Sequence, residues 1–480
     1  MSPVFDEAKY RALLEKLEIS EVNLSDLEKS IRLDSEFYSK AYLQLQNTLE
    51  KLKSKPLNEY CVSISDGNHM SISAFFSEDG IPYYRGQDIY NFFIEQSPCP
   101  LRVPEEIFNA KYMKRSHLHQ GDILMSIVGA IIGNIAIVSE KFPAVCSCKL
   151  AIIRPQPAFK TIIAFFLKSS FGHRQIERLR RGGGQTGFLL EDFPQLQMPD
   201  FTVDFRKKVD SLATDIYDKY LQAINCYKTA EHLLLQELGL MDWQPDNESV
   251  ATKTFADFQN SGRLDAEYYQ PKYDDLFKRI SSYDKSRLGD IVNITKSIEP
   301  GSEAYQEDGV PFVRVSDITK FGITSPEIHL DRDKYYSENL TPKKDTILLS
   351  KDGSVGIAYK VENDLDVITS GALLHLTVKN NDFLPDYLTL VLNSIVVKLQ
   401  AERDAGGSII QHWKPSEIEN VIIPKLPMAI QEQIASKVQE SFALRKESKR
   451  LLDLAKHAVE VAIEQGEDAA MNLLEGVKNA

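Results

Sequence analysis

One short sequence occurs twice in this chain. Residues 32–38 read RLDSEFY and residues 263–269 read RLDAEYY, at a spacing of 231 positions. At that spacing, eight of the seventeen residues from Asp26 to Tyr42 are identical to their counterparts from Asp257 to Tyr273. The period is too long for a solenoid, whose repeats run to roughly 20 to 50 residues. The 480-residue chain is therefore predicted to contain two large, similar halves.

Looser repeats extend the likeness between the halves. GIPYYRGQDI (80–89) matches GVPFVRVSDI (309–318), GDILMSIVGAIIGNIAIV (121–138) matches KDTILLSKDGSVGIAYKV (344–361), and RRGGGQTGFLLEDFPQLQMP (180–199) matches AGGSIIQHWKPSEIENVIIP (405–424). Alternating apolar and β-branched residues, interrupted by Gly and Pro, predict short strands joined by turns. One helix is expected in each unit, near 162–179 and 385–403. Each half is predicted to hold a mixed α/β module.

Two long amphipathic helices are predicted at equivalent places in the halves. Between 203 and 238, apolar residues recur at steps of three or four, which is typical of a helix with coiled-coil character. A helix of this length would span roughly 54 Å. The second runs from about 430 to 463. Ordinary core packing is the alternative, but the equivalent placement favours two antiparallel helices that hold the halves apart.

The ends of the chain suggest that the repeat is circularly permuted. LLEKLEI (13–19) echoes LLQELGL (234–240), so the N-terminus resembles the end of the central helical region. The C-terminus supplies the long helix that the N-terminal region lacks. The segment from about 5 to 30 is therefore expected to pack beside the C-terminal helix.

The charge of the chain restricts any DNA-binding face to a local patch. The net charge is -13, and residues 56–200 carry 14 Lys and Arg against 14 Asp and Glu. Phosphate contacts need Lys and Arg. The opening residues do not resemble a signal peptide, and no apolar stretch approaches the roughly 18 residues that span a membrane. Five scattered cysteines argue against a disulfide framework, so we expect a cytoplasmic protein with no membrane partner.

No motif for catalysis or metal binding is found. The chain lacks the phosphate-binding G-x-x-x-x-G-K-[ST] loop and the Asn/Asp-Pro-Pro-aromatic motif of amino-methyltransferases. Asp200, Asp204 and Lys207 resemble a nuclease cluster, but the lysine stands one place beyond the needed spacing. Cys146 and Cys148 have no second pair at zinc-site spacing and are expected to be reduced. We predict no catalytic residues and no metal site.

In combination, these motifs resemble those of the specificity subunits of Type I restriction-modification systems. The matching pieces are SISDGNH (63–69), GVPFVRVSDI, DTILLSKDGSVGIAY, AGGSIIQHWKPSEIENVIIPKLPMAIQEQIASKV and LLLQELGLMDW. The resemblance implies an α+β fold with two target-recognition domains, two long antiparallel coiled-coil helices and a pseudo-twofold repeat with permuted ends. The implied order is an N-terminal helical segment (1–54), recognition domain 1 (55–201), a central region (202–284), recognition domain 2 (285–427) and a C-terminal helix (428–480).

The resemblance also implies a function without chemistry. Such a subunit binds double-stranded DNA with a bipartite target, one domain per half-site, and assembles with two methyltransferase subunits and motor-endonuclease subunits. It binds no cofactor itself, and S-adenosylmethionine, ATP and Mg²⁺ are expected on the partners. An orphan DNA-binding scaffold and a divergent nuclease are the alternatives.

Loops at equivalent places in the halves are the candidate DNA-reading elements. Arg pairs favourably with guanine, and Asn or Gln with adenine; the alternative for each loop is a solvated surface. Arg85 and Arg314 occupy matching positions, so we expect them to share a structural hydrogen bond, because specificity residues should differ between the halves. The candidate DNA-binding residues are Asn68, His69, Arg178, Arg180, Arg181, Gln185, Thr186, Lys351, Ser354, Ser408, Gln411, His412 and Lys414.

The RLD motifs are the candidate docking elements. Two identical methyltransferase subunits can engage one chain only if it presents nearly the same surface twice. Arg32 with Asp34, and Arg263 with Asp265, are expected to form paired hydrogen bonds at the start of each recognition domain. Tyr38 and Tyr269 are expected to pack on the helices.

Overall fold

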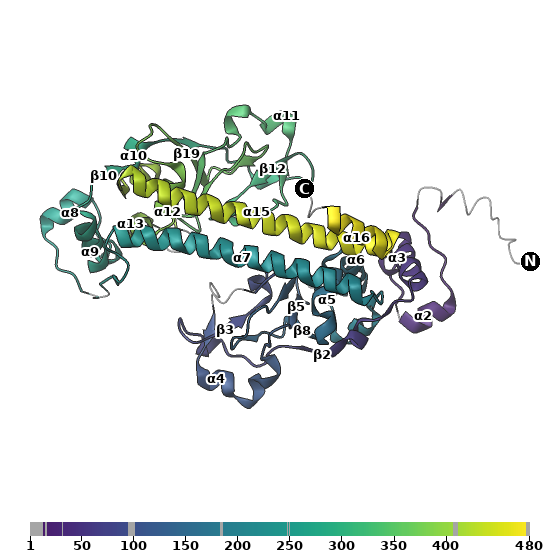
Figure 1. Ribbon diagram of the computed structural model, residues 1–480. Helices are drawn as coiled ribbons and strands as arrows, with labels where there is room; N and C mark the ends of the chain where they lie inside the picture. The colour runs from purple at the N-terminus through teal and green to yellow at the C-terminus, as the bar shows by residue number, and fades with distance from the viewer. Residues whose placement is uncertain are drawn as a thin grey trace, which may run out of the picture. The chain divides into compact units, whose positions relative to one another are not determined.

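The computed structural model describes residues 13–14, 17–30, 32–94, 101–182, 186–246, 248, 250–406 and 411–476. The chain divides into two compact units (Figure 1). Unit 1 comprises Met1–Asp218 and Glu447–Ala480, and unit 2 comprises Lys219–Lys446. Helices and sheets both contribute to each unit, so the fold class is α+β. In the described part of the chain, no helix is both long enough and apolar enough to cross a membrane.

Unit 1 is built on a four-stranded antiparallel sheet in the order β2-β8-β5-β6. Its inner strands are buried on both faces, which is why they read as continuous apolar runs rather than alternating ones. A three-stranded sheet, β4-β3-β7, and a short pair, β1-β9, complete the β-structure. The strands are β1 (Lys55–Pro56), β2 (Cys61–Asp66), β3 (Ile81–Tyr84), β4 (Arg102–Val103), β5 (Ile123–Ser126), β6 (Ile135–Ile137), β7 (Val145–Cys146), β8 (Leu150–Pro155) and β9 (Gln197–Met198).

The helices of unit 1 include one break that the sequence reading missed. The single helix expected near 162–179 is two helices, because Ser169 is extended and caps the second one: its hydroxyl accepts a hydrogen bond from the Gly172 amide at 3.3 Å. A side chain at Gly172 would lie 2.2 Å from the carbonyl oxygen of Phe166, so this junction requires glycine. The helices are α2 (Leu24–Ser30), α3 (Lys40–Lys51), α4 (Glu105–Asn109), α5 (Lys160–Lys168), α6 (Ser170–Leu179) and α16 (Glu467–Gly476).

Unit 2 has the same strand order. Its four-stranded antiparallel sheet runs β11-β19-β16-β17, its three-stranded sheet runs β15-β12-β18, and β10 pairs with β20. In both three-stranded sheets one pairing is parallel, β3 with β7 and β12 with β18. The strands are β10 (Lys285–Arg287), β11 (Val292–Lys296), β12 (Val310–Val313), β13 (Ile318–Thr319), β14 (Gly322–Ile323), β15 (His329–Leu330), β16 (Ile347–Ser350), β17 (Ala358–Lys360), β18 (Ile368–Thr369), β19 (Leu373–Val378) and β20 (Ile422–Pro424).

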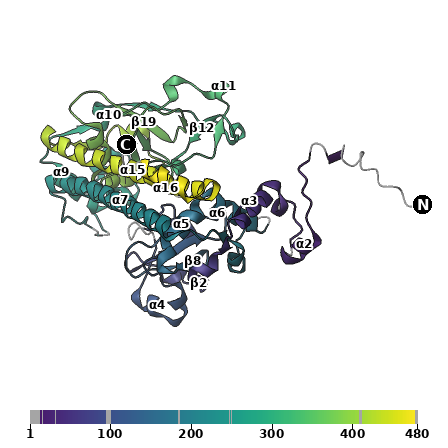
Figure 2. The same ribbon diagram turned by 45° about the vertical axis from the view of Figure 1, so that its right-hand side comes forward.

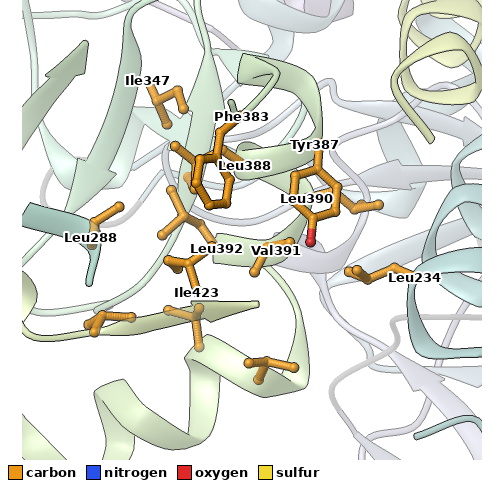
Figure 3. Close-up of a cluster of buried hydrophobic side chains, with 14 of the residues drawn as sticks. Leu234, Leu288, Ile347, Phe383, Tyr387, Leu388, Leu390, Val391, Leu392 and Ile423 are labelled. Atoms are coloured by element: carbon orange, nitrogen blue, oxygen red, sulfur yellow. The ribbon is translucent and has the colours of Figure 1, made fainter. Parts of the chain in front are cut away.

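The helix expected at 385–403 in unit 2 is also broken, at Ser394, whose hydroxyl accepts a hydrogen bond from the Val396 amide. Figure 3 shows the apolar core beneath it, where Tyr387, Leu388 and Val391 of α12 pack near Ile347 and Ile423. The helices are α8 (Phe255–Ser261), α9 (Pro271–Ile280), α10 (Leu288–Ile291), α11 (Arg332–Tyr335), α12 (Pro385–Leu392), α13 (Ile395–Asp404) and α14 (Pro415–Ile418).

The two long helices predicted from periodicity are confirmed. They are α7 (Val203–Glu237) and α15 (Met428–Gln465), and the boundary between the units falls inside both. Within unit 2, the last part of α7 and the first part of α15 lie side by side and contribute to one core (Figures 1 and 2). Buried serine hydroxyls join the helices in each unit: Ser441 donates to the carbonyl of Ala223 at 2.6 Å in unit 2. Ser448 donates to the carbonyl of Ile216 at 2.9 Å in unit 1.

The expected packing of segment 5–30 beside the C-terminal helix is not seen for α2. Both views of unit 1 place α3 between α2 and α16 (Figures 1 and 2). The end of α15 is instead engaged by α6, whose Ser170 amide donates to Glu460 at 2.7 Å, and α16 is held by Thr202, whose amide donates to Glu467 at 2.9 Å. Residues 1–12 lie outside the described part.

Candidate nucleic-acid interface

The first RLD motif forms the expected hydrogen-bonded pair. The Arg32 guanidinium donates to both carboxylate oxygens of Asp34, at 2.5 and 2.6 Å. These bonds hold the pKa of Asp34 below its ordinary value. Arg32 also donates a long bond of 3.5 Å to the carbonyl oxygen of Arg180, and the Tyr38 hydroxyl donates to the Arg32 carbonyl at 3.2 Å. The motif therefore connects the helical segment to the end of α6.

The second motif repeats this geometry in unit 2. Arg263 donates to both oxygens of Asp265 at 2.6 Å, and it donates to the carbonyl oxygen of Asp404 at 3.1 Å. The Tyr269 hydroxyl donates to the Arg263 carbonyl at 2.8 Å. Asp404 is the last residue of α13, as Arg180 is the residue directly after α6. Each motif is thus bonded to the chain just before a glycine-rich loop.

Each glycine-rich loop is closed at its base and tied to a neighbouring hairpin turn. In unit 1, Arg181 and Gly187 exchange two backbone hydrogen bonds of 2.9 and 2.8 Å, and the Gly129 amide donates to the Thr186 carbonyl at 3.1 Å. In unit 2, Gly406 and His412 exchange bonds of 3.1 and 2.7 Å. Thr186, near the end of the loop, thus lies beside the β5–β6 turn. Gln185 and Ser408, two of the predicted DNA-binding residues, lie outside the described residues.

The unit 2 loop is fixed to the β16–β17 turn in the same way. The Gly353 amide donates to the Gln411 carbonyl at 2.9 Å, and the Trp413 amide donates to the Lys351 carbonyl at 2.8 Å. Trp413 is 1% exposed and forms part of the core. Loop base and turn therefore make one composite rim, which we call the recognition rim of each unit: residues 127–134 and Lys149 with 180–182, 186 and 187 in unit 1, and residues 351–357 with 405, 406 and 411–414 in unit 2.

Three predicted DNA-binding residues of unit 1 have partners within the fold. Arg178 donates to the Phe37 carbonyl and to Gln46, both at 2.8 Å, and its guanidinium stacks on the Phe37 ring at 4.1 Å. Burial lowers the pKa of Arg178. Arg181 forms an ion pair with the fully buried Asp192, whose pKa is raised by burial. These contacts occupy both guanidinium groups in the fold.

Asn68 is the third, and its amide is closed on the backbone. It is 3% exposed, donates to the Met70 carbonyl at 2.8 Å and accepts from the Met70 amide at 3.0 Å. His69 is half-exposed beside it, with Nε2 2.7 Å from Asp66, which also pairs with Arg115. Because Asn68 is almost fully buried and its amide is bonded to the backbone, it is not presented at the surface where a base edge would contact it.

The remaining candidates lie on the recognition rims. In unit 1, Arg180 donates to the Thr186 hydroxyl at 3.3 Å, which places both side chains at the loop. In unit 2, Ser354, Gln411, His412 and Lys414 are exposed. Lys414 reaches Glu417 only at 3.6 Å. These side chains are placed where a duplex could contact them.

The base of the unit 2 rim carries a charged cluster. Asp352 accepts from Nδ1 of His412 at 2.8 Å and pairs with Lys351. Burial raises the pKa of Asp352, but the hydrogen bonds from Lys351 and His412 outweigh burial and lower it overall. The carboxylate therefore stays ionised and orients His412 on the rim.

The expected structural role of Arg85 and Arg314 is confirmed. The Arg85 amide donates to Asp88 at 2.8 Å and its guanidinium bonds the same carboxylate. The Arg314 amide donates to Asp317 at 2.8 Å, with its Nε 3.6 Å from that carboxylate. Both pairs close a short turn after the central strand of a three-stranded sheet.

Sequence reasoning missed one rim lysine. The Ile127 amide donates to the Lys149 carbonyl at 3.0 Å in unit 1, and the Lys351 amide donates to the Ala372 carbonyl at 2.9 Å in unit 2. The two pairs are equivalent, so each contains one lysine at a different place: Lys149 directly before β8 in unit 1 and Lys351 directly after β16 in unit 2. Lys149 is exposed. The sequence could have revealed Lys149, because the aligned segments CSCKLAII (146–153) and TSGALLHL (369–376) place this lysine opposite Ala372.

Among the described residues, no group of three His, Cys, Asp or Glu side chains could hold a metal ion. Asp200 pairs with Lys55 at 2.7 Å, while Asp204 and Lys207 lie in the first turns of α7. Cys61, Cys146, Cys148 and Cys226 are free thiols, and burial raises the pKa of Cys146.

Comparison with known proteins identifies the domain in unit 2. Residues 280–452 match the family model "Type I restriction modification DNA specificity domain". Similar solved structures include a Type I restriction-modification S subunit from M. genitalium (15% identity, 86% of this chain and 93% of that chain, TM-score 0.34). Another is an HsdS subunit from Thermoanaerobacter tengcongensis (15% identity, 86% and 96%, TM-score 0.28).

Among curated proteins, none matches the chain. The assignment rests on the domain match rather than on the structural alignments, whose TM-scores are low. The matched domain contains the second recognition rim and the loop base to which Arg263 is bonded. Residues 280–452 therefore belong to the family of Type I restriction modification DNA specificity domains.

Proposed function

We propose that this chain recognises a bipartite DNA sequence, with one recognition rim reading each half-site. One observation carries the proposal. The specificity domain of unit 2 has a motif-anchored rim on a β11-β19-β16-β17 sheet, and unit 1 has the same rim, anchor and strand order. Two versions of one DNA-binding module in a single chain are suited to a target with two parts.

The rims differ where base contacts are expected. Unit 1 offers Arg180 and Thr186 beside Lys149, and unit 2 offers Gln411, His412 and Lys414. Side chains of these types pair with base edges or phosphates. Gln185 and Ser408 remain candidates from the sequence. Differences at these positions would give the two half-sites different sequences.

The partners are proposed to supply the chemistry. The chain acts without catalysis of its own and assembles with methyltransferase and motor-endonuclease subunits, two of the former in our proposal. S-adenosylmethionine, ATP and Mg²⁺ are then bound by those subunits. The proposed recognition domains are residues 55–201 and 285–427, between helical regions 1–54, 202–284 and 428–480.

The long helices are proposed to form an antiparallel coiled coil at the centre of a pseudo-twofold repeat. The serine bonds to Ala223 and Ile216 support this arrangement, because the serines stand seven residues apart on α15 and their acceptors seven apart on α7 in reverse order. A seven-residue interval is one coiled-coil heptad. The helices would then act as a spacer between the half-sites.

The test is to express the full chain with its methyltransferase in a host that lacks other DNA methylation, and to sequence the methylated adenines. A split motif with a fixed gap is expected. A continuous motif, or cleavage of DNA by the purified chain with Mg²⁺ alone, would contradict the proposal. Bipartite DNA binding without methyltransferase association would favour an orphan scaffold.

A further inference from the structure

A buried carboxylate in unit 1 holds two basic side chains at the surface. Asp66 is 7% exposed and is the last residue of β2. Its Oδ2 atom lies 2.7 Å from Nε2 of His69, and its Oδ1 atom accepts a hydrogen bond from the Arg115 guanidinium. The side chains of His69 and Arg115 are 56% and 52% exposed. We call these three residues the carboxylate cluster, because one buried oxygen pair fixes both exposed donors.

The carboxylate cluster is joined to the recognition rim of unit 1 through the backbone. The Cys148 amide donates to the Asn68 carbonyl at 3.0 Å, so the residue before His69 is bonded to the residue before Lys149. The Lys149 carbonyl in turn accepts from the Ile127 amide of the β5–β6 turn at 3.0 Å. The cluster therefore continues the rim along a row of backbone hydrogen bonds.

The equivalent positions of unit 2 carry the opposite charges. Lys296 ends β11 as Asp66 ends β2, and in both units a parallel bridge follows two residues later. Arg115 aligns with Glu338, because KYMKR, which ends at Arg115, matches KYYSE, which ends at Glu338, at a spacing of 223 positions. Both members of the unit 1 ion pair are thus replaced by residues of the other sign. Residues that serve the shared fold should be alike in the two units, whereas residues that read different half-sites should differ.

The contact with Asp66 suits Arg115 to reading a base. Arginine pairs with the O6 and N7 atoms of guanine through two parallel N–H groups, which requires a fixed guanidinium plane. The bond to Asp66 uses one terminal nitrogen of a group that has five N–H donors. A guanidinium already held by a buried carboxylate loses less conformational entropy on binding than a freely rotating one.

We propose that Arg115 is a specificity-determining residue of unit 1, that it reads one guanine of its half-site in the major groove, and that Asp66 positions it. This inference rests on the proposed function. It extends the DNA-reading surface beyond the glycine-rich loop and the hairpin turn, to the segment between α4 and β5 on which Arg115 lies.

The experiment uses the full chain with its methyltransferase in a host that lacks other DNA methylation. Arg115→Ala should relax the methylated sequence at one guanine of one half-site and leave the other half-site and the gap unchanged. Fluorescence anisotropy should show an affinity for the parental target that is about tenfold lower, with the affinity for random DNA unchanged. Arg115→Lys keeps the charge but not the parallel donors, so it should relax the same guanine.

Replacing that guanine with 7-deazaguanine removes the N7 acceptor and tests the contact directly. The replacement should weaken binding of the parent chain and leave binding of Arg115→Ala unchanged. Asp66→Asn removes the charge that holds the guanidinium, so it should make binding less sensitive to the same replacement. A merely structural role of Asp66 would lower the melting temperature without changing this sensitivity.

Lys114→Ala is the matched control, because Lys114 is an exposed cation one residue before Arg115 in the same short helix, Lys111–Ser116. It should leave the methylated sequence unchanged. The melting temperatures of Arg115→Ala and Lys114→Ala should stay close to that of the parent, since exposed charges contribute little to stability.

Equal weakening of specific and random DNA by Arg115→Ala would assign this arginine to a phosphate and overturn the inference. A methylated sequence that keeps every position, or one that relaxes in both half-sites, would overturn it as well. Failure of the proposed function looks different, because the unaltered complex would then methylate no split sequence, and both ideas would be wrong.

Discussion

The Ser441 hydroxyl donates a hydrogen bond of 2.6 Å to the carbonyl oxygen of Ala223, and neither residue is exposed. Because the Ala223 carbonyl lies in the middle of α7, this bond joins two long helices at a defined position. A shift of α15 by one residue would bury the serine hydroxyl without this acceptor. The contact therefore fixes the register of the helix pair in unit 2.

Ser441→Ala should lower the free energy of unfolding by about 1 kcal/mol through loss of one hydrogen bond. Ser441→Leu should cost more, about 1 to 3 kcal/mol, because the site is fully buried. Urea unfolding followed by circular dichroism measures both. Ser211→Ala on the exposed face of α7 is the control and should change stability by less than about 0.5 kcal/mol. Equal effects of the alanine variants would show that the buried bond contributes nothing.

His375 should make stability depend on pH. Burial lowers the pKa of His375 from 6.5 to about 4, and its Nε2 lies 2.7 Å from the Thr369 hydroxyl. The unfolded chain then binds a proton below about pH 6.5, while the folded chain stays neutral until about pH 4. The contribution of neutral His375 to the free energy of unfolding is therefore fully present above pH 6.5. About 3 kcal/mol of it is lost as the pH falls to 4.

Urea midpoints measured between pH 7.5 and 4.5 test this dependence. The His375→Gln variant keeps a hydrogen-bonding group but does not titrate. Its urea midpoint should therefore fall less steeply with decreasing pH than that of the parent. A parent and variant with parallel pH profiles would exclude His375 as the cause.

Gln411→Ala and Lys414→Ala should separate base reading from phosphate contact on the unit 2 rim. Gln411→Ala should weaken binding to the specific target by about 1 to 3 kcal/mol and leave random DNA unaffected. The Lys414 side chain is 74% exposed, so its replacement should weaken binding to all DNA sequences alike. Fluorescence anisotropy with both DNAs measures the difference. If Gln411→Ala lowered the affinity for specific and random DNA equally, Gln411 would also contact the phosphate backbone of the DNA rather than a base.

Lys149→Ala should reduce the salt dependence of DNA binding. If Lys149 contacts one phosphate, the slope of log K against log salt should fall by about 0.9. Lys141→Ala, another exposed lysine of unit 1 but away from the rim residues, is the control and should leave the slope unchanged. An unchanged slope in Lys149→Ala would place this lysine outside the DNA contact.

Lengthening the long helices should lengthen the gap between half-sites. Seven residues inserted near Asn225, matched by seven near Arg445, keep the heptad phase and add about 10.5 Å. That length equals about three base pairs at 3.4 Å each. Sequencing of methylated DNA should show the same half-sites with a wider gap. An unchanged gap would mean that these helices do not set the distance.

The sequence predicted what depends on local pattern and on repetition. Periodicity located α7 and α15 to within about two residues at each end, and the repeat identified the Arg32–Asp34 and Arg263–Asp265 pairs. Both features are determined by residues close together in the chain. The breaks at Ser169 and Ser394 are also local, and a capping serine at equivalent places was a signal that could have found them.

The roles of the loop residues could not be predicted in this way, because a donor's partner depends on distant chain segments. Arg178 finds Phe37 and Gln46, 141 and 132 positions away. One indication was present: Arg403 is the second-last residue of α13 as Arg178 is of α6, and it stacks on Tyr268 as Arg178 stacks on Phe37. An arginine shared by both halves serves the fold, which is the argument that succeeded for Arg85 and Arg314.

The bonds from Arg32 and Arg263 to the loop bases end on backbone carbonyl oxygens, those of Arg180 and Asp404. A carbonyl oxygen is the same in every residue, and here one bond is accepted by a residue of positive charge and the other by one of negative charge. Mutations in a recognition loop therefore leave this attachment intact. New DNA specificities can arise by sequence drift, or by exchange of a whole domain, without any compensating change in the part of the chain that holds it.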